Sequence, residues 1–187
     1  MRKIITATFA AVLMGSMFIA GYAYGQNPHV KNSILEALEN AKPENPHVQV
    51  HSEYKPYNAD ANSMVEIDQA LARARVRGTK VMVVMGANWC HDSRGFAARM
   101  DTPKFQTLIK DNYELVYVSA GTDSGQKDQN RDVSKRFGVD AIEGTPTIFI
   151  AKPDGTVLNP DSAGYWRRSD SIPTDMSYAY FDMYAGK

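Results

Sequence analysis

The sequence predicts one α/β domain with a mixed central sheet and helices on both faces of that sheet. Three observations indicate this class. Apolar runs typical of buried strands occupy residues 81–85, 115–118 and 147–151. Helical segments separate the first two runs, as expected for parallel strands joined by a crossover. A tight Pro153-Asp154-Gly155 turn follows the third run and predicts an antiparallel hairpin with residues 156–158.

Length and charge limit the classes of protein to consider. The chain has 187 residues, of which 43% are hydrophobic and 22% charged, enough for one core but not for two. Its 21 basic and 21 acidic residues give a formal net charge of zero. Because there is no basic excess and no acidic tail, the composition predicts no nucleic-acid partner.

The N-terminus has the pattern of a cleaved signal peptide over residues 1–25. Arg2 and Lys3 precede an apolar stretch from residue 4 to residue 20, and small-x-small patterns follow it. We therefore expect a periplasmic or secreted protein that is not membrane-bound after cleavage. The alternative is an uncleaved membrane anchor, since residues 4–24 are just long enough to span a bilayer.

After the signal peptide we expect an N-terminal extension over residues 26–62 and the domain itself over residues 63–187. The extension holds one short helical pattern, a possible edge strand at 47–51 and a loop at 53–61. In the domain, Ser63 and Glu66 predict a capping box at the start of a helix that ends at Gly78. Further helices are expected over residues 90–100, from residue 103, and over 132–137 and 174–184.

Cys90 is the single cysteine of the chain, so no intramolecular disulfide can form. Exported proteins normally use cysteines in pairs. A leftover cysteine in such a chain indicates either a reactive thiol or an intermolecular bond. The alternative is a buried cysteine that acts as a small apolar residue.

The neighbours of Cys90 favour a reactive thiol. The cysteine follows a buried strand and stands at the exposed start of a helix, where unpaired backbone N–H groups and the helix dipole favour the thiolate. The hydroxyl of Ser93, one turn further, is placed to donate a hydrogen bond to the sulfur. Protonated His91 would stabilise the anion and Asp92 would oppose it, unless both are solvated cap residues. Trp89 is either a lid over the thiol or simple packing.

A second landmark is Thr145-Pro146, which stands directly before the strand at 147–151. A proline at the start of a buried strand removes a donor from the sheet. A cis Thr145–Pro146 peptide bond would explain its presence there.

These two landmarks together resemble the thioredoxin superfamily. The resemblance rests on Trp89-Cys90-x-x after a valine-rich strand and on Gly144-Thr145-Pro146-Thr147 before another strand, and it spans about residues 63–158. It implies a thioredoxin-like fold in which Cys90 is the attacking cysteine. It also implies that Pro146 is a cis proline facing Cys90 and helping to bind extended peptides, with Thr145 offering backbone hydrogen bonds.

Two residues depart from the family pattern. Ser93 stands where the family has its second, resolving cysteine, and Val84 stands where it has a buried acid. The sequence therefore predicts monothiol exchange on protein or peptide disulfides, through a mixed disulfide that an outside thiol such as glutathione or a partner protein must release. Apart from that thiol, we expect no cofactor.

A binding module is the alternative function. In it the fold keeps the peptide groove near Pro146 but has lost turnover, and it serves as a chaperone or an assembly subunit. Metal binding is not expected, because His47 and His51 share one strand face without a nearby cysteine pair.

Overall fold

The computed structural model describes residues 28–40 and 53–186. The predicted signal peptide and the predicted edge strand at 47–51 lie outside these residues. Within the described part of the chain, no helix has the length and apolar character needed to cross a membrane.

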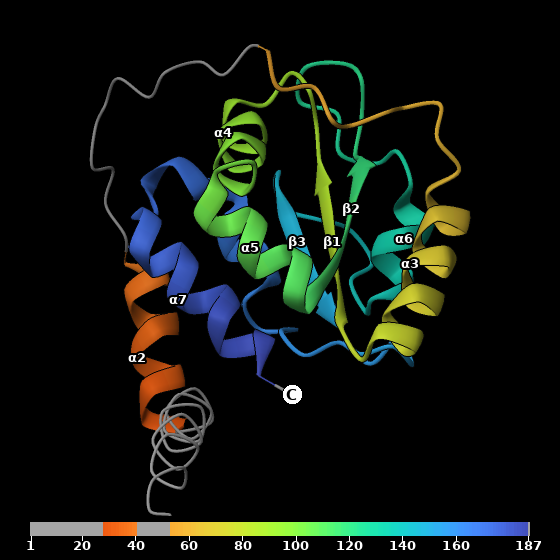
Figure 1. Ribbon diagram of the computed structural model, residues 1–187. Helices are drawn as coiled ribbons and strands as arrows, with labels where there is room; N and C mark the ends of the chain where they lie inside the picture. The colour runs from red at the N-terminus through yellow and green to blue at the C-terminus, as the bar shows by residue number, and fades with distance from the viewer. Residues whose placement is uncertain (1–27, 41–52, 187) are drawn as a thin grey trace, which may run out of the picture.

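A three-stranded sheet forms the centre of the molecule, with strand order β2-β1-β3 (Figure 1). The strands are β1 (Lys80–Gly86), β2 (Tyr113–Ser119) and β3 (Thr147–Ala151). β1 pairs in parallel with β2 and antiparallel with β3, which confirms the predicted mixed sheet.

The predicted hairpin forms, but the predicted fourth strand at residues 156–158 is wrong. These residues pair with β3 and its following turn through one bridge, between Ala151 and Val157, and through the backbone hydrogen bonds Lys152 N–H to Thr156 and Leu158 N–H to Ile150, without a regular strand. The physical reason is the side chain of Asn159, whose Oδ1 accepts from the Ile150 N–H at 2.7 Å and whose Nδ2 donates to the Ile148 carbonyl at 2.8 Å. One amide side chain thus satisfies β3 backbone groups that a partner strand would otherwise pair.

Helices cover both faces of the sheet, as the sequence predicts (Figure 1). One face packs against α3 (Ser63–Arg77) and α6 (Arg131–Arg136) through Val81, Val83 and Met85 of β1. The other face packs against the remaining helices of the domain through Met82 and Val84. These helices are α4 (His91–Met100), α5 (Pro103–Asn112), α7 (Thr174–Ala185) and the 3-10 helix η1 (Ala163–Ser171).

The start of α3 differs from the predicted capping box. Asn62 is the N-cap, and its side chain accepts a hydrogen bond from the Val65 N–H at 3.2 Å. Ser63 is the first helical residue, and its hydroxyl is buried without a partner among the described residues. Asparagine is as favourable an N-cap as serine, so the N-cap position falls on Asn62, one residue before the predicted Ser63.

The helix of the N-terminal extension, α2 (Pro28–Glu39), packs against the core of the domain. It lies along α7, and its Leu38 is only 1% exposed. The Lys31 ammonium lies 5.7 Å from the centroid of the Tyr184 ring, and Arg168 donates to the Glu39 carbonyl at 2.8 Å. Apolar contact, a cation–π contact and a hydrogen bond therefore dock α2 on the domain.

Asn159→Ala should destabilise the fold strongly. It removes the partners of a buried N–H and a buried carbonyl on β3, each costing about 1–3 kcal/mol when left unsatisfied. Urea unfolding followed by circular dichroism would measure the loss. Asn40→Ala, which removes an exposed hydrogen bond to the Glu36 carbonyl, is the matched control and should leave the midpoint nearly unchanged. Equal midpoints for Asn159→Ala and the parent chain would contradict the assigned role.

Candidate active site around Cys90

The Cys90 loop stands at the carboxyl end of the central strand. β1 ends at Gly86, the chain turns, and Cys90 becomes the N-cap of α4 with extended backbone angles (φ −83°, ψ 124°). The Cys90 N–H donates to the Ala87 carbonyl at 3.1 Å, which closes the turn. The sequence prediction of a cysteine at a helix start after a buried strand is confirmed.

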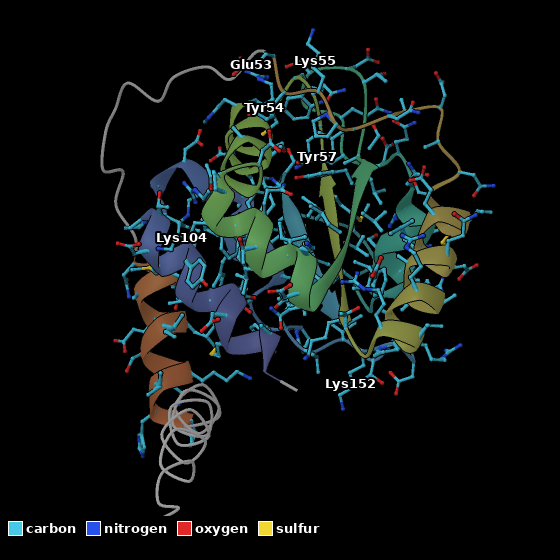
Figure 2. The ribbon with its side chains drawn as sticks, in the orientation of Figure 1. Glu53, Tyr54, Lys55, Tyr57, Lys104 and Lys152 are labelled. Atoms are coloured by element: carbon cyan, nitrogen blue, oxygen red, sulfur yellow. The ribbon has the colours of Figure 1, made fainter. Side chains whose placement is uncertain are left out.

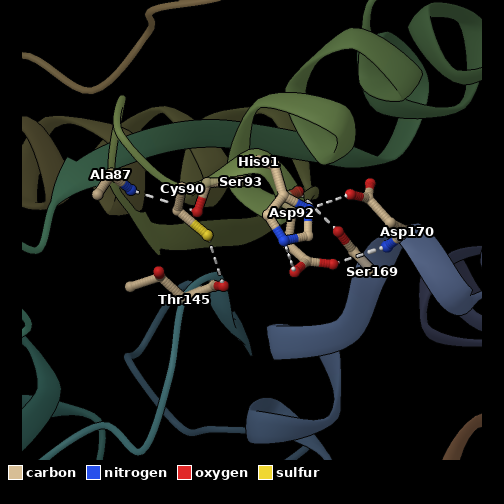
Figure 3. Close-up of polar contacts among 8 residues, drawn as sticks. All are labelled: Ala87, Cys90, His91, Asp92, Ser93, Thr145, Ser169 and Asp170. Carbon is tan, nitrogen blue, oxygen red and sulfur yellow. Dashed lines mark hydrogen bonds and ion pairs between the residues drawn. The ribbon is translucent and has the colours of Figure 1, made fainter. Parts of the chain in front are cut away.

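The surroundings of the sulfur differ from the prediction. Cys90 is only 8% exposed, and its Sγ–H donates to the Thr145 carbonyl at 3.2 Å (Figure 3). It makes no side-chain capping hydrogen bond with the first turn of α4. The prediction of an exposed sulfur held by helix amides is therefore wrong. The Thr145 segment covers the sulfur, and its carbonyl accepts a hydrogen bond from the thiol.

Ser93 is fully buried, one turn after the cysteine. Its Oγ accepts a hydrogen bond from the Ala87 N–H at 3.3 Å (Figure 3). Among the described contacts its hydroxyl does not donate to the sulfur, as the sequence analysis expected it to. Ser93 therefore holds the turn before the cysteine rather than the thiol itself.

His91 turns away from the sulfur toward η1 (Figure 3). Its Nδ1 lies 2.6 Å from Oδ2 of Asp170, and its Nε2 lies 3.5 Å from Oδ2 of Asp92. The predicted contact of a protonated His91 with a Cys90 anion is absent from the described structure, because Asp170 takes the imidazole instead.

Asp92 is not a solvated cap residue. Its Oδ1 accepts from the Asp170 N–H at 2.9 Å, and its carbonyl accepts from the Ser169 hydroxyl at 2.7 Å. Burial is the main cause that raises the pKa of Asp92, and the nearby Asp170 carboxylate adds to it, although the Asp170 N–H and His91 act in the opposite direction. The first turn of α4 is thus tied to η1 at several points.

Gly95 gives Asp170 the room for this arrangement. A Cβ built on Gly95 would lie 2.3 Å from the Asp170 Oδ1, so a larger residue there would displace the carboxylate. His91, Asp92 and Asp170 each offer one ligand atom, and these atoms lie within 4.8 Å of one another. In the structure they instead bind one another, as a histidine bridging two carboxylates.

The residues expected to contact substrate lie on both sides of the sulfur. The Thr145–Pro146 peptide bond is cis, and both residues are buried. The Thr145 carbonyl is already occupied by the Cys90 Sγ–H. Trp89 is half-buried, and its Nε1 has no hydrogen-bond partner within the described chain. The structure thus brings Trp89, Cys90 and Thr145 to one edge of the sheet.

The sequence analysis missed the segment 54–59, which we call the strap. It crosses the carboxyl ends of β1 and β2 (Figures 1 and 2). Tyr57 on the strap donates its hydroxyl proton to the Ser93 carbonyl at 3.1 Å, and its backbone binds the side chain of Asn88. The strap has no periodicity, so the one available signal was Gly86, a glycine at a strand end where another group approaches closely.

A cavity of about 400 Å³ opens between the strap and the loop after β2. Lys55, Tyr57 and Asn58 of the strap line it, together with Asn88 and Thr122. Polar and apolar surface line the cavity in nearly equal parts, and through Asn88 it adjoins the turn that precedes Cys90.

The comparisons with known proteins agree with this architecture. Residues 62–153 match a family model described as thioredoxin-like. No curated protein matches the chain. Among solved structures, the chain is similar to a disulphide isomerase from Xylella fastidiosa Temecula1, with a TM-score of 0.61 and 25% sequence identity over 68% of this chain and 94% of that chain.

The mixed sheet with helices on both faces, the cysteine at the end of its central strand and the match over residues 62–153 all point to one fold. The chain therefore carries a thioredoxin-like domain, with the fold of the thioredoxin superfamily.

Proposed function

We propose that the protein is a thiol–disulfide oxidoreductase or isomerase that acts through Cys90 alone. The observation that carries this proposal is the placement of the single cysteine of the chain at the end of the central strand, against the Thr145–Pro146 segment. The similarity to a solved disulphide isomerase supports the same class of reaction.

The first step forms a mixed disulfide. The Cys90 thiol gives its proton to solvent, and the thiolate attacks one sulfur of a substrate disulfide. A bond forms between that sulfur and Cys90 Sγ while the substrate S–S bond breaks. The departing thiolate then takes up a proton.

The second step needs a thiol from outside the chain, because no second cysteine exists to resolve the mixed disulfide. The thiolate of glutathione, of a partner protein or of the substrate itself attacks the mixed disulfide and releases the sulfur of Cys90. Attack by the substrate rearranges disulfides without net oxidation. Attack by glutathione leaves a substrate–glutathione mixed disulfide, and attack by a second glutathione then completes the reduction of the substrate and forms oxidised glutathione.

The neighbouring residues bind and position in this proposal. Once Cys90 has formed a mixed disulfide its proton is gone, so the Thr145 carbonyl becomes free to accept a backbone N–H from an extended substrate. The half-buried Trp89 and the cis-bonded Pro146 flank that peptide. His91 holds the first turn of α4 through Asp170 and does not touch the sulfur.

The proposed site of action is the periplasm or the medium outside the cell, with protein or peptide disulfides as substrates. The signal-peptide pattern of residues 1–25 supports export. The N-terminal sequence of the protein recovered from fractionated cells tests this, since an exported protein should begin near residue 24 or 26.

A single turnover is expected when no outside thiol is present. Native protein mixed with a chromogenic aromatic disulfide should release about one aromatic thiolate per chain, since Cys90 is its one thiol. Added glutathione should convert this burst into continuous release. Absorbance and intact-protein mass spectrometry follow both phases; Cys90→Ser should release none without glutathione, and only the uncatalysed amount with it. Many turnovers without added thiol would exclude the monothiol mechanism.

Ser93→Cys should restore internal resolution. A cysteine one helical turn from Cys90 can attack the mixed disulfide, so the variant should release about two aromatic thiolates per chain and end as an intramolecular disulfide. Ser93→Ala is the matched control, which also loses the acceptor of the Ala87 N–H but gains no thiol. If Ser93→Cys still stops after one thiolate, the position of residue 93 does not allow resolution.

A peptide-binding module without turnover is the second candidate, and the 8% exposure of Cys90 favours it. Native protein would then release no aromatic thiolate in the burst experiment. Cys90→Ser would still bind an extended peptide, as measured by calorimetry, with an affinity equal to that of the parent chain. Both results together would replace the enzymatic proposal with this one.

A further inference from the structure

Resting on the proposed exchange reaction, we infer that Tyr57 is a positioning residue for Cys90. Tyr57 lies on the strap, outside residues 62–153 that match the thioredoxin-like family model. It contacts the chain on both sides of the cysteine, and it is only 2% exposed.

The ring of Tyr57 fixes the end of β1. A Cβ built on Gly86 would lie 2.4 Å from two carbon atoms of this ring, so the ring lies directly on the glycine backbone. The same ring packs edge-on against Tyr117 of β2, with the centroids 5.4 Å apart. The tyrosine therefore fills the space over the strand end from which the Cys90 loop departs.

The backbone of Tyr57 fixes the turn before the cysteine. Its N–H donates to Asn88 Oδ1 at 3.2 Å, and its carbonyl accepts from Asn88 Nδ2 at 2.8 Å. The Asn88 carbonyl accepts in turn from Arg94 at 2.8 Å, so the residue is held from both sides.

The hydroxyl of Tyr57 fixes the helix after the cysteine, because it donates to the Ser93 carbonyl at 3.1 Å. Burial raises the pKa of Tyr57 well above its ordinary value, so the hydroxyl remains protonated and can donate at any physiological pH. The interior is too dense for these groups to shift freely.

Tyr57 thus touches the chain at positions 86, 88 and 93, on both sides of the cysteine, and none of its described hydrogen bonds goes to the sulfur. The position of Sγ relative to the Thr145 carbonyl depends on the backbone between these points. A small displacement of a reacting atom is enough to slow a reaction severely. Tyr57 therefore acts on the reaction through the geometry of the Cys90 loop.

The kinetic test uses a glutathionylated peptide as substrate and reduced glutathione as the outside thiol. Tyr57→Ala should lower kcat by about tenfold with KM within about twofold, because it moves the sulfur and removes no substrate contact. Tyr57→Phe keeps the ring on Gly86 and should recover kcat to within about threefold of the parent chain. A folded Tyr57→Ala variant with the parent kcat would overturn the inference.

The second readout is independent of turnover, so it separates this inference from the proposed function. Iodoacetamide alkylation of Cys90 in the native protein should change at least about threefold in Tyr57→Ala, because the sulfur shifts against the Thr145 segment. Leu38→Ala, which opens a cavity at α2 and α7, is the control for lost stability and should leave the alkylation rate unchanged. An equal change in the alkylation rate of both variants would show that Tyr57 contributes only to stability and would overturn the inference.

A double-mutant cycle tests the ring contact itself. Gly86→Ala should impair alkylation and exchange in the parent chain, since the new Cβ collides with the ring. In the Tyr57→Ala background the ring is gone, and the same substitution should have little further effect. Additive effects of the two substitutions would refute the contact. If the parent chain shows no exchange at all, the proposed function fails, and the alkylation arm still decides the role of Tyr57.

Discussion

The antiparallel pairing of β1 with β3 is the constraint on which the site depends. It places Met85, near the end of β1, opposite Thr147, at the start of β3. The segments that follow one strand and precede the other therefore meet at the same edge of the sheet. Cys90 and Thr145 stand in these two segments, and their hydrogen bond is a direct result of the strand register.

That register is itself secured by burial on both faces. The side chains of β1 alternate between two separate apolar clusters, so a slip of one residue would exchange every contact. The parallel partner β2 fixes the other edge of β1. The Cys90 sulfur thus lies just beyond the end of β1, the central strand of the sheet, although it belongs to a turn.

The sequence predicted what local patterns encode. The three strands, the helices at 63–77, 91–100, 103–112 and 174–185, and the placement of Cys90 before a helix all follow from periodicity, capping and turn residues. The fourth strand was wrong because one side chain, Asn159, replaces a strand partner, and no local pattern distinguishes such an asparagine from a loop residue.

The sequence predicted which residues form the candidate site, but not which contacts these residues make. The pairing of His91 with Asp170 joins residues 79 positions apart, and that of Tyr57 with Ser93 joins residues 36 positions apart. Neither pair shares an element or a periodic face, so only the tertiary structure reveals them. The same holds for the burial of the sulfur, which depends on how the Thr145 segment folds back over it.

The thiol environment explains how a single-cysteine site differs from a dithiol site. In a dithiol site the second thiolate attacks the mixed disulfide and expels the substrate thiolate, whereas here residue 93 carries a hydroxyl that accepts from the Ala87 N–H. The serine therefore orders the turn before Cys90, but it provides no second thiol that could resolve a mixed disulfide within the domain. In the proposed reaction, the rate at which Cys90 is released depends on the thiol that reaches the mixed disulfide from solution.

The docking of α2 on α7 determines which side of the domain faces the solution when the protein is immobilised through α2. The start of α2 and the start of α4, which Cys90 caps, lie at opposite ends of the molecule (Figure 1). Because α2 is packed into the core, this orientation is fixed rather than free. A surface, bead or fusion partner attached directly at the start of α2 would therefore lie on the side of the domain away from the start of α4, and would leave the cysteine end turned toward the solution.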